Sequence, residues 1–157
     1  IIHSPGRPVI GQLMEAFEKK QAPVIAVEKV PMENVSSYGV IDPSGELEGA
    51  LHQIRSMVEK PPVDKAPSNL AIIGRYILTP EIFDFIDTTA PDTRGEIQLT
   101  TALNSQLEKS PAYALEFSGT RYDAGDKLGF LIATVEYALR SESLRDQFRE
   151  YLKKIKL

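Results

Sequence analysis

The chain has 157 residues, of which 42% are apolar and 25% charged, and its net charge is −4. This length suits one domain with a substantial core, and the composition excludes a disordered protein. With no cysteine, no basic stripe and no apolar run near the roughly 20 residues that span a bilayer, disulfides, nucleic-acid partners and membrane partners are not expected. The only histidines, His3 and His52, are far apart and expected at the surface, so no zinc site is predicted. The sequence shows no targeting segment, which predicts a cytoplasmic protein.

In the first half of the chain, apolar residues recur at helical and strand spacings. The segment 9–20 has the apolar stripe of an amphipathic helix, and 24–27 is a short apolar run typical of a buried strand. Asp42-Pro43-Ser44-Gly45 is strong turn chemistry and should end a strand at 38–41. The remaining elements expected here are a helical turn at 32–37 and strands at 51–59 and 70–78.

The second half predicts four helices and one strand. Thr79-Pro80 is a helix start with a capping threonine, and Asp126 opens another helix in the same way. The elements expected are helices at 81–86, 96–107, 126–139 and 143–155 and a strand at 113–117. Strands that alternate with helices predict an α/β fold with a mixed sheet flanked by helices. We expect one sheet to contain, as neighbours, the runs 24–27, 54–58 and 71–78, packed by the helices 9–20 and 96–107.

An adjacent acid and base, Glu59 and Lys60, end the strand at 51–59, and two prolines follow them. Successive side chains on a strand point to opposite faces, so Glu59 and Lys60 cannot both face the core. One of them is expected to reach into a cleft at the end of the strand, where open α/β sheets bind their ligands. Taken alone, such a pair is more typical of a solvated strand terminus.

Four segments carry polar residues that a division into core and surface leaves unexplained. They are Tyr38-Gly39-Val40, Glu59-Lys60-Pro61, Gly95-Glu96-Ile97-Gln98-Leu99-Thr100 and Arg121-Tyr122-Asp123-Ala124-Gly125-Asp126-Lys127. In this order and at these spacings, together with the run 68–76, the chain resembles the C-terminal half of the bacterial UTP–glucose-1-phosphate uridylyltransferases. Their wider relatives are the sugar-1-phosphate nucleotidyltransferases. The resemblance covers nearly the whole chain.

This resemblance implies that residues 1–157 are the C-terminal, sugar-phosphate-binding half of a Rossmann-like nucleotidyltransferase fold. It implies UTP and glucose 1-phosphate as substrates, UDP-glucose as product and Mg²⁺ as cofactor. In the family, the N-terminal half contributes a Gly-x-Gly-Thr-Arg loop and a metal-binding aspartate, and neither is found in this sequence. The missing N-terminal half of the same protein is therefore an expected partner. We also expect the chain to be inactive alone and to form a homo-oligomer, as its relatives commonly do.

The resemblance further implies roles for four residues. Lys60 is expected to bind the sugar phosphate and align it for attack, as the catalytic residue of this half. Glu59 is expected to accept hydrogen bonds from sugar hydroxyls. Gly39 would let the backbone approach the sugar ring, where a Cβ would collide. Asp123 would supply a carboxylate to Mg²⁺, a hard cation that needs few protein ligands beside substrate phosphates.

Simpler interpretations stay open at these positions. Gly39 is equally consistent with a strand bulge. A turn residue is the alternative interpretation of Asp123, for which the resemblance favours the metal role. Asp126 is interpreted as a helix cap, and Glu96 as an acid that favours the positive end of a helix. At the level of function, the alternatives are a nucleotidyltransferase for another sugar or base, and a non-catalytic sugar-phosphate-binding or assembly module.

Overall fold

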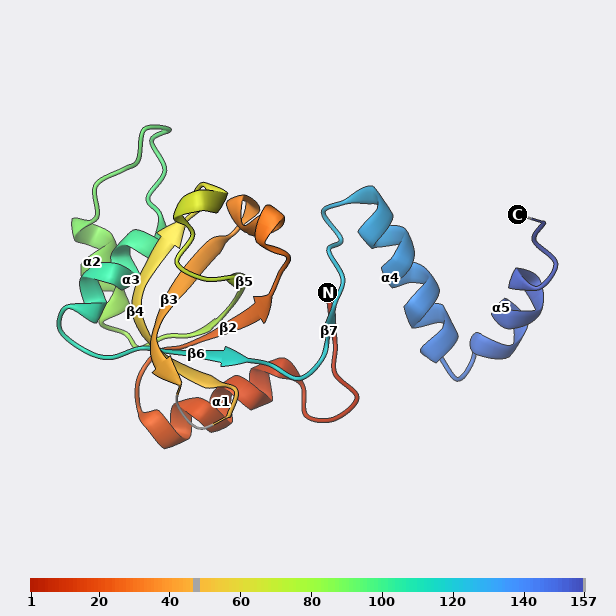
Figure 1. Ribbon diagram of the computed structural model, residues 1–157. Coiled ribbons are helices and arrows are strands. Elements are labelled where there is room, and N and C mark those ends of the chain that lie inside the picture. The colour runs from red at the N-terminus through yellow and green to blue at the C-terminus, as the bar shows by residue number, and fades with distance from the viewer. Residues whose placement is uncertain (47–48, 157) are drawn as a thin grey trace. The chain divides into compact units, whose positions relative to one another are not determined.

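The structure is a computed structural model that describes residues 1–46 and 49–156 (Figure 1). The chain divides into two compact units. The larger unit is Gly6–Ser118, and the smaller one consists of Ile1–Pro5 together with Gly119–Leu157. No helix within the described ranges is long and apolar enough to cross a membrane.

A five-stranded mixed sheet forms the centre of the larger unit. Its strands are β2 (Val24–Lys29), β3 (Gly39–Glu46), β4 (Leu51–Glu59), β5 (Leu70–Ile77) and β6 (Tyr113–Glu116). They lie in the order β2-β5-β3-β4-β6, and a parallel pairing of β6 with β2 closes the sheet into a barrel. All other pairings are antiparallel. The mixed sheet confirms the prediction, whereas the open sheet assumed for the ligand cleft is corrected to a closed one.

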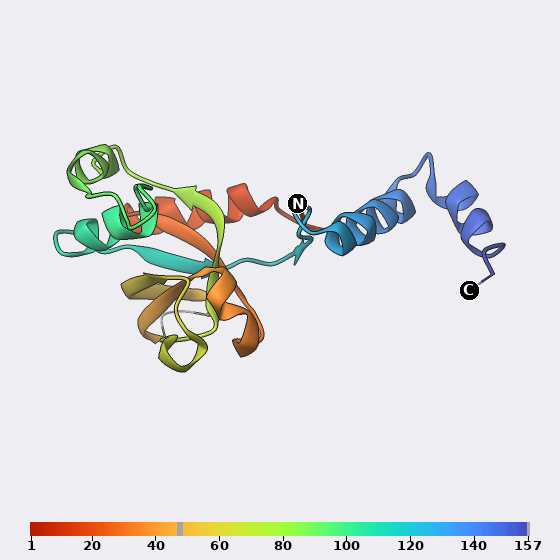
Figure 2. The same cartoon turned by 90° about the horizontal axis from the view of Figure 1, so that it is seen from above.

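Three helices pack on this barrel. The helix α1 (Val9–Lys20) contacts β2 and β5 and buries Val9, Leu13 and Ala16, which recur at helical spacing on one face. The helix α2 (Ile82–Thr88) lies beside α3 (Leu99–Leu107) in both views, and α3 contacts β4 (Figure 2). A cluster of buried side chains from the strands and these two helices, including Ile25, Ile41 and Leu103, forms the main core.

Both faces of the strand β2 are buried. All of the side chains from Val24 to Val27 are fully buried, so neither face of this strand meets water. Burying both faces is what a continuous apolar run requires. The prediction that the three apolar runs share one sheet, packed by α1 and α3, is confirmed. The prediction that they are neighbours holds only for β2 and β5, because β3 separates β4 from β5 and β6 separates β4 from β2.

Two short 3-10 helices lie in the connections that lead to and from the strands: η1 (Met32–Ser37) and η2 (Val63–Lys65), which contact each other. The predicted helical turn at 32–37 is therefore confirmed. The predicted turn at 42–45 is wrong, because β3 continues to Glu46. Its pairing with β4 shifts register on both sides of Pro43, and such irregularities let a strand accommodate a proline.

Two predicted helix starts are also corrected. The helix predicted to begin at Glu96 begins at Leu99. In α2 the N-cap is Glu81, without a side-chain capping bond, and Thr79 instead uses its hydroxyl to accept a hydrogen bond from Gln106 Nε2 at 3.1 Å. His52, predicted at the surface, is buried on β4.

The smaller unit contains a two-stranded sheet and two helices. The strand β1 (Ile2–His3) pairs antiparallel with β7 (Thr120–Arg121), and α4 (Lys127–Arg140) and α5 (Arg145–Leu152) follow. The side chain of Asp126 accepts a hydrogen bond from the Gly129 N–H at 2.7 Å, which confirms it as the cap of α4. The residues of β1 are only half-buried.

Candidate functional site

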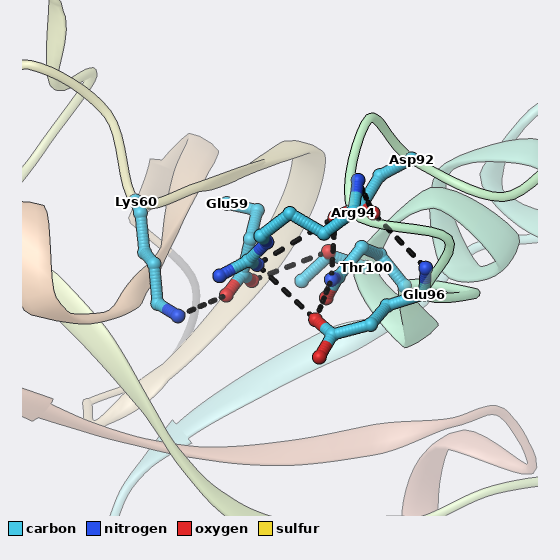
Figure 3. Close-up of polar contacts among 7 residues, drawn as sticks. Glu59, Lys60, Asp92, Arg94, Glu96 and Thr100 are labelled. Atoms are coloured by element: carbon cyan, nitrogen blue, oxygen red, sulfur yellow. Dashed lines mark hydrogen bonds and ion pairs between the residues drawn. The ribbon is translucent and has the colours of Figure 1, made fainter.

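The predicted acid and base lie together at the end of β4. Glu59 is the last residue of this strand, and Lys60 has a φ of 46°, in the left-handed region that residues other than glycine rarely adopt. The Lys60 N–H donates to the Tyr38 carbonyl at 3.0 Å. Because Lys60 has left the extended conformation, strand alternation no longer separates the two side chains. Lys60 Nζ lies 4.0 Å from Glu59 Oε1, and both groups reach solvent, with 49% and 32% of their side chains exposed (Figure 3).

A hydroxyl from α3 meets the other oxygen of this carboxylate. Thr100, in the first turn of α3, donates from Oγ1 to Glu59 Oε2 at 3.3 Å and is itself buried. Tyr76 on β5 is also close enough to feel the carboxylate: burial raises the pKa of the Tyr76 phenol, and the charge of Glu59 raises it further. Two other elements, α3 and β5, therefore place groups near Glu59, and its Oε1 faces Lys60.

Gly39 lies opposite Glu59 in the antiparallel pairing of β3 with β4. A Cβ added to Gly39 would come within 3.0 Å of Glu59 Oε2 and within 3.3 Å of both Ile72 Cδ1 and Thr100 Cγ2. The first register shift in this pairing comes only after Asp42, so the strand-bulge interpretation of Gly39 is wrong. The glycine instead makes room for the carboxylate of Glu59. Whether it also makes room for a sugar ring stays a prediction.

The segment that leads into α3 is organised around Asp92. Its Oδ1 accepts the N–H groups of Arg94 and Glu96 at 2.8 and 3.0 Å, and its Oδ2 accepts from Gln98 Nε2 at 3.0 Å. These bonds, led by the one from the Glu96 N–H, lower the pKa of Asp92 to about 2. A carboxylate that accepts several hydrogen bonds from one short segment holds that segment in a single conformation. Asp92 thereby fixes the approach to the first turn of α3, where Thr100 lies.

Two charged neighbours complete this segment. Arg94 NH2 lies 3.2 Å from Glu96 Oε2 and 3.5 Å from Asp92 Oδ2 (Figure 3). Glu96 precedes α3 and is not in its first turn, so the prediction that it favours the helix end is corrected to an ion pair within the loop. Sequence analysis missed Asp92 because its role depends on loop conformation and on no spacing motif.

Asp123 lies in the smaller unit, whereas Gly39, Glu59 and Lys60 are brought together in the larger one. Its Oδ1 accepts the Gly125 N–H at 3.0 Å, and its Oδ2 lies 3.3 Å from Arg121 NH1. The hydrogen bond from Gly125 and the one from Arg121 lower the pKa of Asp123, so the carboxylate is charged near neutral pH. About half of the side chain is exposed. The bond to Gly125 supports the turn interpretation, and an exposed, ionised carboxylate also suits a metal.

A second polar cluster joins three strands where the barrel closes. His52 Nε2 lies 2.6 Å from Glu116 Oε1, and Lys29 Nζ lies 2.9 Å from Glu116 Oε2. Burial alone would raise the pKa of Glu116, but hydrogen bonds from Lys29 and His52 hold it below its usual value. These residues come from β2, β4 and β6, so the cluster ties together the strands on either side of the parallel pairing. Among the described residues, no group of three or more metal-binding side chains is found.

Comparison with known proteins identifies similar chains. The profile of the family described as Nucleotidyl transferase matches residues 7–139. A UTP–glucose-1-phosphate uridylyltransferase from Streptococcus pyogenes is 44% identical over 155 residues, which cover 99% of this chain and 51% of that protein. A crystal structure of UDP-glucose pyrophosphorylase complexed with UDP-glucose is 42% identical, with a TM-score of 0.84 over 89% of this chain and 53% of that one. A UTP-bound UGPase from Acinetobacter baumannii is 32% identical, with a TM-score of 0.87 over 99% of this chain and 54% of that one.

These matches support the fold and correct one prediction. The α/β arrangement of a mixed sheet with helices matches the UDP-glucose pyrophosphorylase structures. The chain spans about half the length of the relatives it matches. The prediction that it is a C-terminal half is wrong, because the match at residues 7–139 aligns it with the N-terminal, nucleotidyltransferase region of its relatives. That prediction rested on the order and spacing of four polar segments and the run 68–76, and a resemblance carried by short motifs does not fix which part of a longer protein a chain aligns with.

Proposed function

Because this chain belongs to the nucleotidyl transferase family, we propose that it binds the sugar phosphate in a uridylyltransferase reaction. In that reaction UTP and glucose 1-phosphate give UDP-glucose and pyrophosphate. The observation that carries the proposal is the arrangement at the end of β4, where a lysine and a carboxylate lie side by side opposite a glycine. The lysine is suited to a phosphate, and the carboxylate is suited to sugar hydroxyls. The structures of relatives bound to UDP-glucose, the product of this reaction, and to UTP, a substrate, support the proposal.

The reaction needs positioning and charge neutralisation more than covalent help from the protein. A phosphate oxygen of glucose 1-phosphate attacks the α-phosphorus of UTP, a new P–O bond forms, and pyrophosphate leaves with the electrons of the broken bond. Lys60 holds the attacking phosphate and reduces the repulsion between two anions. Glu59 accepts hydrogen bonds from the sugar hydroxyls and thereby sets the orientation of the ring.

Asp123 is the residue that we propose for Mg²⁺. The donor chemistry fits, because Mg²⁺ is commonly held by one or two carboxylates together with substrate phosphates and water. The Asp123 carboxylate is ionised and half-exposed, and it keeps free lone pairs beside its bonds to Gly125 and Arg121. When bound, the ion neutralises charge on the phosphates. The protein contributes the Asp123 carboxylate, which the Gly125 N–H and Arg121 hold in one orientation.

Titration of glucose 1-phosphate into the chain tests this function. We expect saturable binding in calorimetry, and glucose, which lacks the phosphate, should not reproduce it. Glu59→Gln should bind about tenfold more weakly, since a hydrogen bond to a charged group is lost.

We also expect no release of pyrophosphate from UTP and glucose 1-phosphate by the chain alone, because the sequence has no Gly-x-Gly-Thr-Arg segment. Mg²⁺-dependent release well above that of Lys60→Ala would contradict this expectation. Absence of saturable sugar-phosphate binding would overturn the proposed function itself.

The metal role of Asp123 has its own measurement. Mn²⁺ can stand in for Mg²⁺ in electron paramagnetic resonance, which counts free ions directly. With UDP-glucose present, we expect Asp123→Asn to weaken Mn²⁺ binding about tenfold, because a charged ligand is replaced by a neutral one. Asp126→Asn is the matched control: it removes the same charge three residues away, and asparagine still caps α4. If both variants bind Mn²⁺ alike, Asp123 is only a turn residue.

A further inference from the structure

Glu59 is held by a residue to which no role has yet been given. Of its two carboxylate oxygens, Oε2 accepts the Thr100 hydroxyl at 3.3 Å, whereas Oε1 lies 4.0 Å from Lys60 Nζ. We propose that Thr100 is a positioning residue that fixes the plane of the Glu59 carboxylate and thereby sets which sugar stereoisomer the site accepts. This inference rests on the proposed function of Glu59 as the acceptor for sugar hydroxyls.

The surroundings of Thr100 restrict it to one orientation. Only 7% of the residue is exposed, and it lies in the first turn of α3, directly after the loop that Asp92 fixes. Its methyl group packs near Gly39, since a Cβ there would come within 3.3 Å of Thr100 Cγ2. With the methyl wedged against β3, the hydroxyl is directed toward the carboxylate. The hydroxyl makes the bond to Glu59, and the methyl group helps to set its direction.

The fixed oxygen leaves the other one free for a ligand. A distance of 4.0 Å between Glu59 Oε1 and Lys60 Nζ is longer than a direct hydrogen bond, so Oε1 keeps its lone pairs available. An ionised carboxylate is an acceptor only. If its plane rotated freely, it would accept hydroxyls from several directions and distinguish epimers poorly. A carboxylate in a fixed plane forms a strong hydrogen bond only with a hydroxyl that points along the lone pairs of its oxygen. A polar site rejects close analogues in this way.

The alternative is that Thr100 is merely structural, linking α3 to β4. The two roles predict different results. A structural residue would affect all ligands of the site equally, or would affect only folding. A positioning residue would affect the preferred sugar more than its epimers, because the epimers never made the oriented bond. The ratio of two affinities therefore separates these roles, whereas a single affinity does not.

The test is calorimetric titration of glucose 1-phosphate, galactose 1-phosphate and mannose 1-phosphate into the chain and its variants. Thr100→Val keeps the shape and removes the hydroxyl, Thr100→Ser keeps the hydroxyl, and Thr101→Val is an exposed neighbour as control. We expect Thr100→Val to weaken glucose 1-phosphate binding about tenfold. Its effect on the two epimers should stay within about twofold, so the preference for glucose falls. Thr100→Ser should recover most of that preference, and Thr101→Val should change nothing.

Each outcome is decisive. Equal losses for all three sugars, or a Thr100→Val variant within about twofold of the parent for glucose 1-phosphate, would overturn the inference while leaving the proposed function intact. No saturable binding by the parent chain would overturn the proposed function and this inference together. Circular dichroism verifies the fold of each variant. If Thr100→Val does not fold, Thr100→Ala removes the hydroxyl without introducing a second methyl, and the same ratio is measured.

Discussion

Replacing Lys60 with alanine should weaken the binding of glucose 1-phosphate about 100-fold, the upper range for a hydrogen bond to a charged group. The ammonium group is suited to this role because its contact with Glu59 is long, at 4.0 Å, and its charge remains available to a ligand. Half of the side chain is exposed, so solvent screens part of its attraction for a phosphate. Calorimetry at low and moderate salt concentrations should therefore show the larger loss at low salt.

Two controls make this result specific. Lys65→Ala removes an equal charge from η2, five residues away, and should leave the affinity within about twofold if only local charge matters. Lys60→Arg keeps the charge but replaces a compact ammonium group with a rigid planar fork, so it should recover little of the lost affinity. A Lys60→Ala variant that binds as well as Lys65→Ala does would remove Lys60 from the proposed site.

Local patterns were sufficient for those parts of the fold that depend on near neighbours in sequence. The apolar stripe of α1 and the apolar run of β2 each predict their element within two residues. The same is true of η1 and β4. The turn predicted at 42–45 failed because pairing with β4 offers this segment backbone partners that outweigh its turn chemistry. The closure of the barrel was not predicted for a related reason. The parallel pairing of β6 with β2 joins residues nearly ninety positions apart in sequence, such as Val24 and Tyr113.

The candidate site shows the same division. Glu59, Lys60 and Gly39 could be proposed from sequence because they lie in segments that resemble a known family, whereas the strand end and the glycine taken alone favoured simpler interpretations. Thr100 could not, since its bond to Glu59 spans 41 residues and threonine in a first helical turn is usually explained as a helix-capping choice. Asp92 was missed because the loop that it organises has no periodicity.

Two further predictions concern the whole protein. The chain spans about half the length of its relatives, so oligomer formation and the choice of sugar and base stay predictions for this protein. The proposed binding of a sugar phosphate involves residues that β3, β4 and α3 bring together, whereas turnover also needs residues that bind UTP.

Gly39 offers the strongest geometric test of this arrangement. The first atom added to its side chain would lie 3.0 Å from Glu59 Oε2, which is tight enough that the carboxylate must move by a few tenths of an ångström. Further contacts at 3.3 Å to Ile72 and Thr100 restrict the direction in which the neighbours can move. We expect Gly39→Val to lower the free energy of unfolding by about 1–3 kcal/mol, as overpacked sites do. It should also weaken glucose 1-phosphate binding about 100-fold, because both Glu59 and its Thr100 partner are displaced.

The smaller change Gly39→Ala separates crowding from backbone effects. The control is Gly6→Ala, since a Cβ at Gly6 meets no atom within 4 Å, and it should change neither stability nor binding. If the Thr100 methyl is part of the obstruction, Gly39→Ala should cost less in a Thr100→Ser background than in the parent chain. Such non-additivity is expected only for residues in contact. Denaturant unfolding and calorimetry of the four members of this cycle measure it. Strictly additive effects, or parental affinity in Gly39→Ala, would mean that Gly39, Glu59 and Thr100 do not act as one packed unit.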